Sequence, residues 1–477
     1  MIGVNLFTQN DWSAVLPLFI VACSALVVLL ADFVWRGRTS AQIAIAIGVA
    51  ALLAGGITAG LEYGRAYDAF GGGFVLGGFA VVFQEIIVLA ALFSLAIYRT
   101  SMSEEKTSGA VALLLWATAG AMLMAGAANL MTIFLGLELL SLALYCLCGL
   151  ANRPTSREAA LKYLILSSTA SGFLLFGMAL LFGASGSVTL SSLASPALLT
   201  DPLYWMGGGL FLIGISFKLS LIPFHVWTPD VYEGAPLPVT AYMTVVTKAA
   251  TLAVFARFAY AAIPPGAQYP LLIPFYLIAG VSMIGGNLGM LAQTDMKRLL
   301  AFSGIAQVGY IVAALAGATA QGMRYAIYYL VAYTFMNLGA FAIVALISGK
   351  NEEGSRLESF RGLAARRPLL AAAMTFFLLA LAGFPPTAGF LGKILILATD
   401  ITAGYAWLAG LLIAGTAISL YAYFKVVRLM YERPPVDAAP AAAPLPLAYV
   451  TVAICAVAVV LMTFYPLTPS NILPLTR

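Results

Sequence analysis

The hydrophobic pattern of the chain consists of long, continuous apolar runs that are separated by short polar, glycine-rich or proline-containing segments. A helix that crosses the hydrocarbon core of a bilayer needs about 20 predominantly apolar residues. Fourteen runs come close to this length, over residues 12–34, 41–60, 74–97, 109–127, 130–151, 160–183, 204–227, 237–261, 270–292, 299–317, 324–348, 369–400, 405–430 and 445–466. Because the apolar residues are continuous and do not alternate with polar ones, the pattern excludes a β-barrel. We expect an all-α polytopic membrane protein with about fourteen transmembrane helices.

The composition of the 477 residues agrees with this class of protein. Hydrophobic residues make up 62% of the chain and charged residues only 9%, whereas an ordinary soluble domain is about 25% charged. These values exclude a soluble globular domain, a disordered chain and a nucleic-acid-binding protein.

The positive charges are distributed unevenly between the predicted loops. Seventeen of the 24 lysine and arginine residues lie in alternate loops, and three lie in the remaining ones. Since basic residues accumulate on the inner side of a membrane, both termini are predicted to face outward. The loop that holds Asp230 and Glu233 falls on the inner side but contains no basic residue.

Four basic residues lie within the apolar runs. Arg257 is close to an outer end and can extend its side chain to the surface. Lys218 and Lys248 lie near the middle of their runs, and Lys393 lies somewhat further toward the outer side. Glu138 is an acid in the middle of the fifth run.

A charged side chain in hydrocarbon is expensive, at roughly 2.5–3.5 kcal/mol for an ionised lysine in insertion assays. Such a residue is retained when it pairs, faces water or gives up its proton, and a lysine that does the last can load and release protons. Two interpretations remain open. The acid and the three lysines form a proton path, or they form ion pairs that hold the helices together.

Two polar stripes accompany these charges. Their members recur at helical spacing and so share one face of a helix. The first stripe is Thr244, Thr247 and Thr251, and the second is Ser303, Gln307 and Tyr310. These groups can order water along a hydrophilic axis, and the alternative is that they form hydrogen bonds between helices.

Two of the predicted helices contain proline breaks. Pro223 interrupts the seventh run, and Pro385 and Pro386 interrupt the twelfth. Proline removes a backbone donor, and unwound backbone at membrane depth is tolerated only where it is buried in protein or lines a cavity. His225, the single histidine, follows the first break, where either a proton relay or an ordinary core histidine is possible.

The spacing of the breaks predicts an internal duplication. They are five helices apart, and an odd number of helices per repeat inverts the topology, as in many transporters. We expect N-terminal helices 1–3 over residues 1–108, a first five-helix repeat over 109–262, a second, inverted repeat over 263–433, and a last helix over 434–477.

Several motifs of energy conversion are missing from the sequence. It contains no phosphate-binding G-x-x-x-x-G-K-[ST] loop, no cysteine cluster suited to an iron–sulfur centre, and a single histidine. We therefore expect no metal or cofactor on this chain, and a partner must supply the energy for ion movement.

Three motifs resemble a known family. The run FKLSLIPFHVWTPDVYEGAPLPVTAYMTVVTKAA (217–250), the run AQTDMKRLLAFSGIAQVGY (292–310) and the run GFPPTAGFLGK (383–393) are similar to signatures of the antiporter-like, proton-translocating membrane subunits of respiratory complex I. The wording TPDVYEGAP, together with lysine at position 393, most resembles the N-type members of that family.

The resemblance implies a role for each charged residue. Glu138 would pair with Lys218, and Lys248 would act as a relay on the central axis. Lys393 would donate protons near the outer exit, and His225 would connect the relays.

The resemblance also implies a setting. Lys162, at the inner start of the sixth helix, would modulate the acid–lysine pair. The chain would lie in a bacterial cell inner membrane with periplasmic termini, beside M-type and K-type subunits and the lateral helix of the L-type subunit. NADH oxidation and quinone reduction, with FMN and iron–sulfur clusters, would take place in partner subunits. The alternatives are a subunit of a multisubunit Na⁺/H⁺ antiporter and a structural subunit that carries no protons.

Overall fold

The computed structural model describes residues 8–35, 37–98, 104–151, 153–264, 267–349, 353–433 and 446–466. Both ends of the chain, whose side of the membrane the sequence analysis predicts, lie outside these ranges. The α-helices are α1 Gln9–Val34, α2 Gly37–Leu61, α3 Gly78–Tyr98, α4 Glu104–Gly126, α5 Leu130–Gly149, α6 Pro154–Ser185, α7 Pro202–Leu219, α8 Trp227–Gly234, α9 Leu237–Arg257, α10 Gln268–Leu291, α11 Met296–Ala314, α12 Ala320–Ser348, α13 Leu363–Arg366, α14 Pro368–Ala382, α15 Ala388–Thr402, α16 Ala406–Tyr431 and α17 Pro446–Phe464. The short elements are strands β1 Tyr67–Ala69 and β2 Phe74–Leu76, 3₁₀-helices η1 Leu190–Ala194, η2 Pro196–Thr200, η4 Glu353–Ser355 and η5 Leu357–Phe360, and the π-helix η3 Phe258–Ala262.

The prediction of an all-α membrane protein is confirmed. Twelve helices among the described residues are long and apolar enough to cross a membrane. The predicted runs 299–317 and 369–400 are not among the twelve. The first corresponds to α11, which begins at Met296 and carries Lys297 and Arg298 in its first turn, and the second is divided into α14 and α15.

One local prediction needs correction. The inner segment with Asp230 and Glu233 is the helix α8 and not a loop. Residues of the segment 71–78 contribute β2 to a small antiparallel hairpin with β1, which is too short to leave a periodic signal. The four cysteines are all free, with Cys148 and Cys455 buried and Cys146 exposed on α5.

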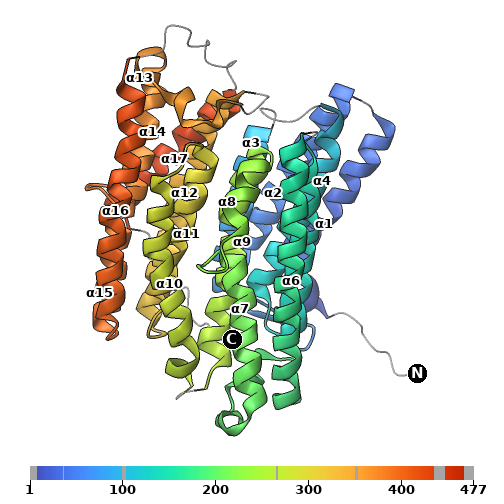
Figure 1. Ribbon diagram of the computed structural model, residues 1–477. Coiled ribbons are helices and arrows are strands. Elements are labelled where there is room, and N and C mark those ends of the chain that lie inside the picture. Colours follow the sequence, from blue (N-terminus) through green and yellow to red (C-terminus); the bar gives the residue numbers. More distant parts are fainter. Residues whose placement is uncertain are drawn as a thin grey trace.

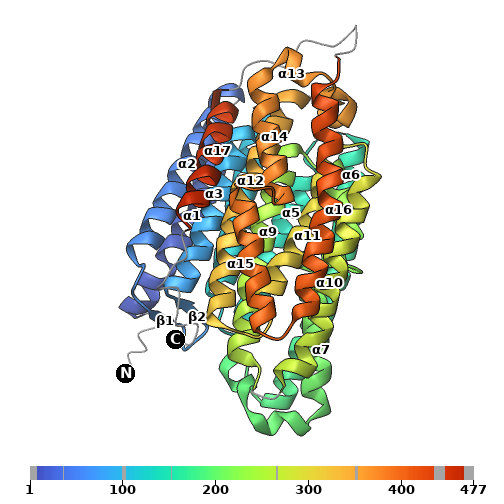
Figure 2. The same ribbon diagram turned by 90° about the vertical axis from the view of Figure 1, so that its left-hand side faces the viewer.

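The helices form one elongated bundle in which α9 occupies the centre. Figure 1 shows α1 and α2 on one side of the bundle and α15 and α16 on the other. Figure 2, turned by 90°, shows the hairpin β1–β2 at the end of the bundle opposite α13. Every residue of α9 is buried. A charged side chain on α9 is therefore surrounded by protein whatever lies outside the bundle.

Glycines bring several neighbouring helices into backbone contact. A Cβ atom on Gly120 of α4 would lie 2.6 Å from the backbone nitrogen of Leu140 and 2.8 Å from the carbonyl oxygen of Gly136, both on α5. On α6, a Cβ atom on Gly177 would lie 2.8 Å from the carbonyl oxygen of Gly207 on α7. Small residues at such positions let membrane helices approach closely, since apolar side chains gain little by leaving lipid.

Candidate functional site

Lys218 lies at the last turn of α7, directly before the first helix break. Its side chain is 4% exposed, and its Nζ atom donates hydrogen bonds to the hydroxyl oxygens of Ser141 on α5 and Ser167 on α6, at 2.6 Å each. The ring of Tyr163 lies 5.7 Å away. Two hydroxyl groups and an aromatic face thus replace the hydration shell of this buried amine.

Glu138 lies on α5 one turn before Ser141, and one of its carboxylate oxygens is buried without a hydrogen-bond partner. Within the described ranges, no ion pair joins it to Lys218, whose hydrogen bond to α5 goes to Ser141. The acid and the base are therefore neighbours linked through a hydroxyl-bearing helix face.

The first break begins at Ser220. This residue ends α7 in the left-handed conformation, with φ of 62°, and the peptide bond between Ile222 and Pro223 is cis. His225 lies in the same break, where its Nδ1 atom is buried without a partner among the described residues. The ring centroid of His225 is 6.2 Å from that of Phe302, and among the described residues no hydrogen bond joins its Nδ1 atom to a lysine.

Lys248 is the buried amine at the centre of the bundle. It is 1% exposed, and its Nζ atom donates a hydrogen bond of 2.8 Å to the hydroxyl oxygen of Ser220. Thr228 of α8 donates to the same hydroxyl at 2.7 Å. The rings of Trp227 and Tyr232 lie 5.9 and 5.7 Å from Nζ. The break in α7 therefore places Ser220, two residues after Lys218, against Lys248.

The threonine stripe of α9 is turned toward its own helix. The hydroxyls of Thr244, Thr247 and Thr251 donate to backbone carbonyls three or four residues earlier, at 2.6–2.7 Å. Thr244 also accepts a hydrogen bond from Asn337 of α12. The oxygen atoms of these hydroxyl groups can still accept hydrogen bonds from the interior of the bundle, but their protons are donated to the backbone of α9.

The stripe of α11 makes contacts with other helices. Ser303 shares a hydrogen bond with the hydroxyl of Tyr423 on α16, and the hydroxyl of Tyr310 accepts from Asn287 on α10. The side-chain amide of Gln307 donates to the carbonyl oxygen of Leu381 at 3.1 Å. Gln307 thus connects the polar axis to the second break.

Lys393 lies on α15, beyond the second break, and is 3% exposed. Its Nζ atom donates to the carbonyl oxygens of Leu381, at 3.2 Å, and Ala382, at 3.0 Å. These are the last carbonyls of α14 and have no partner within that helix. The end of α14, directly before the break that contains Pro385 and Pro386, therefore supplies the acceptors of this lysine.

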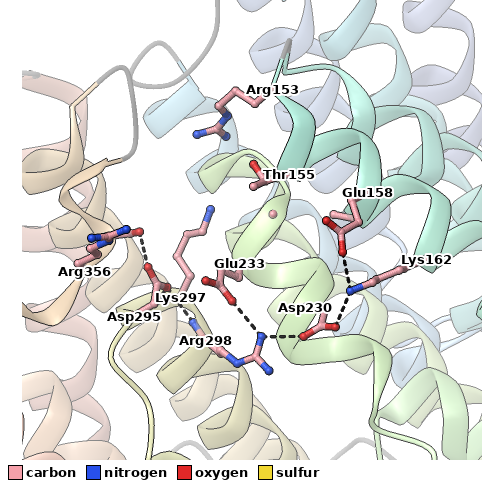
Figure 3. A pocket seen from close by; sticks show the side chains of 13 residues that line it. Arg153, Thr155, Glu158, Lys162, Asp230, Glu233, Asp295, Lys297, Arg298 and Arg356 are labelled. Carbon is pink, nitrogen blue, oxygen red and sulfur yellow. Dashed lines mark hydrogen bonds and ion pairs between the residues drawn. The ribbon is translucent and has the colours of Figure 1, made fainter.

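At the end of the bundle where α6 and α11 begin, charged side chains surround an open pocket of about 730 Å³. Figure 3 shows Lys162 between Glu158 and Asp230, with Nζ–oxygen distances of 2.8 and 2.9 Å, and Arg298 between Asp230 and Glu233, at 2.6 and 2.9 Å. Burial raises the pKa of Asp230, but the hydrogen bonds and positive charges of Lys162 and Arg298 outweigh it. The net pKa of Asp230 lies below its ordinary value. Lys162 therefore forms its ion pairs with Glu158 and with Asp230 of α8.

Sequence reasoning missed the hydroxyl groups that hold the amines, above all Ser167 and Ser220, and the buried acid Asp400 on α15. Ser220 could have been noticed because it stands between Lys218 and the proline break. Among the described residues, no group of three or more histidine, cysteine, aspartate or glutamate side chains is placed to hold a metal ion.

Comparison with known proteins defines the class. Residues 127–419 match the family model described as NADH:quinone oxidoreductase/Mrp antiporter, transmembrane. A chain of respiratory complex I from Thermus thermophilus, solved with bound aureothin, superposes with a TM-score of 0.82 at 34% identity, over 96% of this chain and 99% of that one. Fold, buried lysines and comparison together define an antiporter-like membrane subunit.

The relatives specify the member of that class. The chain is 41% identical to NADH-quinone oxidoreductase subunit N 1 of Symbiobacterium thermophilum, over 87% of each chain. It is 38% identical to subunit N of Trichlorobacter lovleyi, over 90% of this chain and 89% of that one. It therefore belongs to the NADH-quinone oxidoreductase subunit N family, as the sequence motifs predict. A chain of the Mrp complex from Dietzia sp. DQ12-45-1b, at 22% identity and a TM-score of 0.79, shares the fold.

Proposed function

We propose that this chain translocates protons across the membrane as the N-type subunit of an NADH:quinone oxidoreductase. The observation that carries the proposal is the position of Lys218, Lys248 and Lys393, each buried and each hydrogen-bonded at or beside a helix break. An amine held by hydroxyl and carbonyl oxygens can be charged without a fixed counterion, and it can release its proton when a neighbouring charge changes.

The proton path runs along the polar axis. Glu138 and Lys218 are the first acid and base of the path, which lie close to each other without a direct ion pair, and Ser220 connects the break beside Lys218 with Lys248. Tyr329 donates to Gln307, Gln307 donates to the carbonyl oxygen of Leu381, and Lys393 donates to the same oxygen. His225 serves as a side connection from the first break, since its Nδ1 atom is free to accept a proton. Lys162 modulates the path through Asp230.

Fourteen membrane crossings in two inverted repeats account for the geometry. The twelve apolar spans are supplemented by α11 and by the pair α14–α15. Residues 109–262 and 263–433 then correspond helix by helix, flanked by 1–108 and 434–477. Two features support the duplication. Each break starts at a residue with positive φ, Ser220 at 62° and Gly383 at 80°, and each has a proline three residues later, Pro223 and Pro386.

The orientation follows from charge. The pocket with Lys162 and Arg298 lies on the cytoplasmic side and receives protons, and the hairpin β1–β2 lies on the periplasmic side. Both termini are then periplasmic.

The energy comes from partner subunits. The relatives are named as subunits of NADH-quinone oxidoreductase, so NADH oxidation, FMN, iron–sulfur clusters and quinone reduction are assigned to other chains. M-type and K-type subunits and the lateral helix of the L-type subunit are the neighbours that the family resemblance implies. Charge displacement passes from them to Glu138 and Lys218.

The test uses Lys393→Met in the assembled enzyme in membrane vesicles. NADH oxidation with an artificial acceptor reports assembly, and quenching of a pH-sensitive dye reports proton uptake per NADH oxidised. Lys425→Met is the matched control, because Lys425 is an exposed lysine that donates to the carbonyl oxygen of Leu291. We expect a lower proton yield in Lys393→Met and an unchanged yield in the control.

Two results would overturn the proposal. Full proton yield in Lys393→Met and in the double variant Glu138→Gln, Lys218→Met, with normal assembly, would favour a structural subunit. Purification of the chain without NADH-oxidising partners, together with Na⁺/H⁺ exchange, would favour a multisubunit antiporter.

A further inference from the structure

The carboxyl group of Asp400 is not used by the proposed proton path, and its surroundings among the described residues are unusual. Asp400 lies near the C-terminal end of α15 and is 0% exposed. Neither carboxylate oxygen has a hydrogen-bond partner within the described part of the chain. Buried polar groups are nearly always hydrogen-bonded, and an exception requires an explanation. Because burial disfavours an unpartnered carboxylate, the neutral acid is the resting form, and ionisation has to be transient.

Asp400 shares a helix face with Lys393. The two residues are seven positions apart on α15, which is two turns and about 10 Å at 1.5 Å per residue. The buried residues Ile396 and Thr399 lie on the same face between them. Lys393 is bound to the carbonyls at the break, at the inner end of α15, whereas Asp400 lies toward the opposite end. The acid is therefore one step further along the direction of proton exit.

Three tyrosines continue from Asp400. The backbone nitrogen of Tyr405 donates to the Asp400 carbonyl oxygen at 2.8 Å, and the ring of Tyr405 lies 5.6 Å from that of Tyr276. Tyr276 lies near both Asp400 and Tyr260, and the hydroxyl of Tyr260 donates to the carbonyl oxygen of Thr319 at 2.9 Å. The hydroxyl of Tyr276 donates to the carbonyl oxygen of Leu315. Tyrosine hydroxyls both donate and accept hydrogen bonds, so this cluster can pass a proton.

The cluster reaches a surface pocket. Tyr260 lines an open pocket of about 500 Å³ together with Asp68, Thr189 and Arg257. Asp68 belongs to β1, and the hairpin β1–β2 lies at the end of the bundle opposite α13 (Figure 2). Residues of α6, α8 and α11 line the charged pocket of Figure 3, whereas residues of β1, η1 and η3 line this one, so the two pockets are built from different segments of the chain.

We propose that Asp400 is the outlet relay of this chain, which accepts the proton released by Lys393 and passes it through Tyr276 and Tyr260 to the pocket beside Asp68. The proposal rests on the proposed function. In the forward step the neutral Asp400 acid first releases its proton through the tyrosines to water at the pocket, and the transient carboxylate then takes a proton from the Lys393 ammonium, which becomes an amine. This second transfer restores the neutral acid for the next cycle. Water between Lys393 and Asp400 carries the proton across the two turns.

The test compares Asp400→Asn with Asp400→Glu in the assembled complex. Asparagine keeps the size but cannot carry the proton, whereas glutamate keeps the acid. Asp201→Asn is the matched control, because Asp201 caps α7 by accepting from the backbone nitrogen of Leu203, and asparagine caps equally well. We expect Asp400→Asn to lower the proton yield as far as Lys393→Met does, Asp400→Glu to restore at least half of the loss, and the control to equal the wild type.

A spectroscopic readout separates a relay from a structural group. Infrared difference spectra of the complete enzyme should contain the carbonyl band of a protonated carboxylic acid that disappears in Asp400→Asn and shifts in Asp400→Glu. If Asp400→Asn does not assemble, the shift in Asp400→Glu still decides, and the absence of any shift would overturn the proposal.

The outcomes distinguish the two levels of inference. A wild-type yield in Asp400→Asn, while Lys393→Met has lost yield, refutes the outlet relay and leaves the proposed function standing. A loss in Asp400→Asn alone, with Lys393→Met unaffected, refutes the transfer from Lys393. Full yield in all of these variants and in the double variant Glu138→Gln, Lys218→Met refutes the proposed function itself.

Discussion

Replacing Ser220 by glycine or by alanine separates its two contributions. The side chain of Ser220 accepts hydrogen bonds from Lys248 and Thr228, and its backbone has a φ of 62°. Both variants lose the hydroxyl group. A hydrogen bond to a charged donor contributes about 1.5–3 kcal/mol. Glycine adopts positive φ freely, whereas a residue with a Cβ atom costs about 1–2 kcal/mol there. Ser220→Gly should therefore be more stable than Ser220→Ala by about 1 kcal/mol.

Proton transfer should respond differently from stability. If Lys248 exchanges protons through Ser220, the loss of about 1.5–3 kcal/mol slows that step roughly 10- to 150-fold in both variants, since 1.36 kcal/mol is a factor of ten. The assay is proton yield per NADH in vesicles, alongside the thermal-shift midpoint of the purified complex. We expect the variants to differ in midpoint and to agree in their low yield. A glycine variant that pumps like the wild type while the alanine variant does not would refute the reasoning, because the yield would then follow backbone stability.

Three further predictions concern packing, pH and capping. Gly177→Ala should destabilise the protein by about 1–3 kcal/mol through overpacking, and so lower the thermal midpoint, because its Cβ atom would meet the backbone of α7. In Gly183→Ala the new Cβ atom would meet only Leu203, at 3.8 Å, so the midpoint should hold or rise. Equal midpoints in the two variants would contradict the contact of Gly177 with α7. The pKa of Asp230 is depressed in the folded chain, so its contribution to stability is present above the unfolded value of about 3.9 and is lost as pH falls through the lower folded value. Asp230→Asn should therefore flatten the acid limb of the midpoint-against-pH curve, and an unchanged limb would count against the network. Asp295 caps α11 by accepting from two backbone nitrogens, so Asp295→Ala should cost about 1 kcal/mol and Asp295→Asn clearly less in the same thermal assay, whereas equal losses would exclude capping.

The charged positions could be predicted from the sequence because lipid makes them conspicuous. Lys218, Lys248 and Lys393 stand out in apolar runs, and only burial or function explains a lysine there. The hydroxyl groups that hold them do not stand out. Serine is common in membrane helices, and nothing along the chain indicates that Ser167 on α6 faces Lys218 on α7.

The breaks were predicted from their prolines, but their consequences were not. The sequence could not indicate that the carbonyls freed at the end of α14 would bind Lys393, because that contact depends on how α15 folds back across the break. The expected direct pairing of Glu138 with Lys218 illustrates the same limit. Helical spacing predicts which residues share a face, but the approach of α5 to α7 decides whether Ser141 or Glu138 meets the amine.

The glycine contacts between helices limit how the protein can transmit a signal. At Gly120 and Gly177 there is no room for a Cβ atom, so the backbones of α4 and α5, and of α6 and α7, are in direct contact. If one helix of such a pair slid along the other, a residue with a larger side chain would move into the position of the glycine, where only a hydrogen atom fits. These contacts resist sliding of α4 along α5 and of α6 along α7. We therefore expect movement to concentrate in the unwound segments and in the long side chains of the lysines, so that a change of electric field can reach an amine without any sliding of these helix pairs.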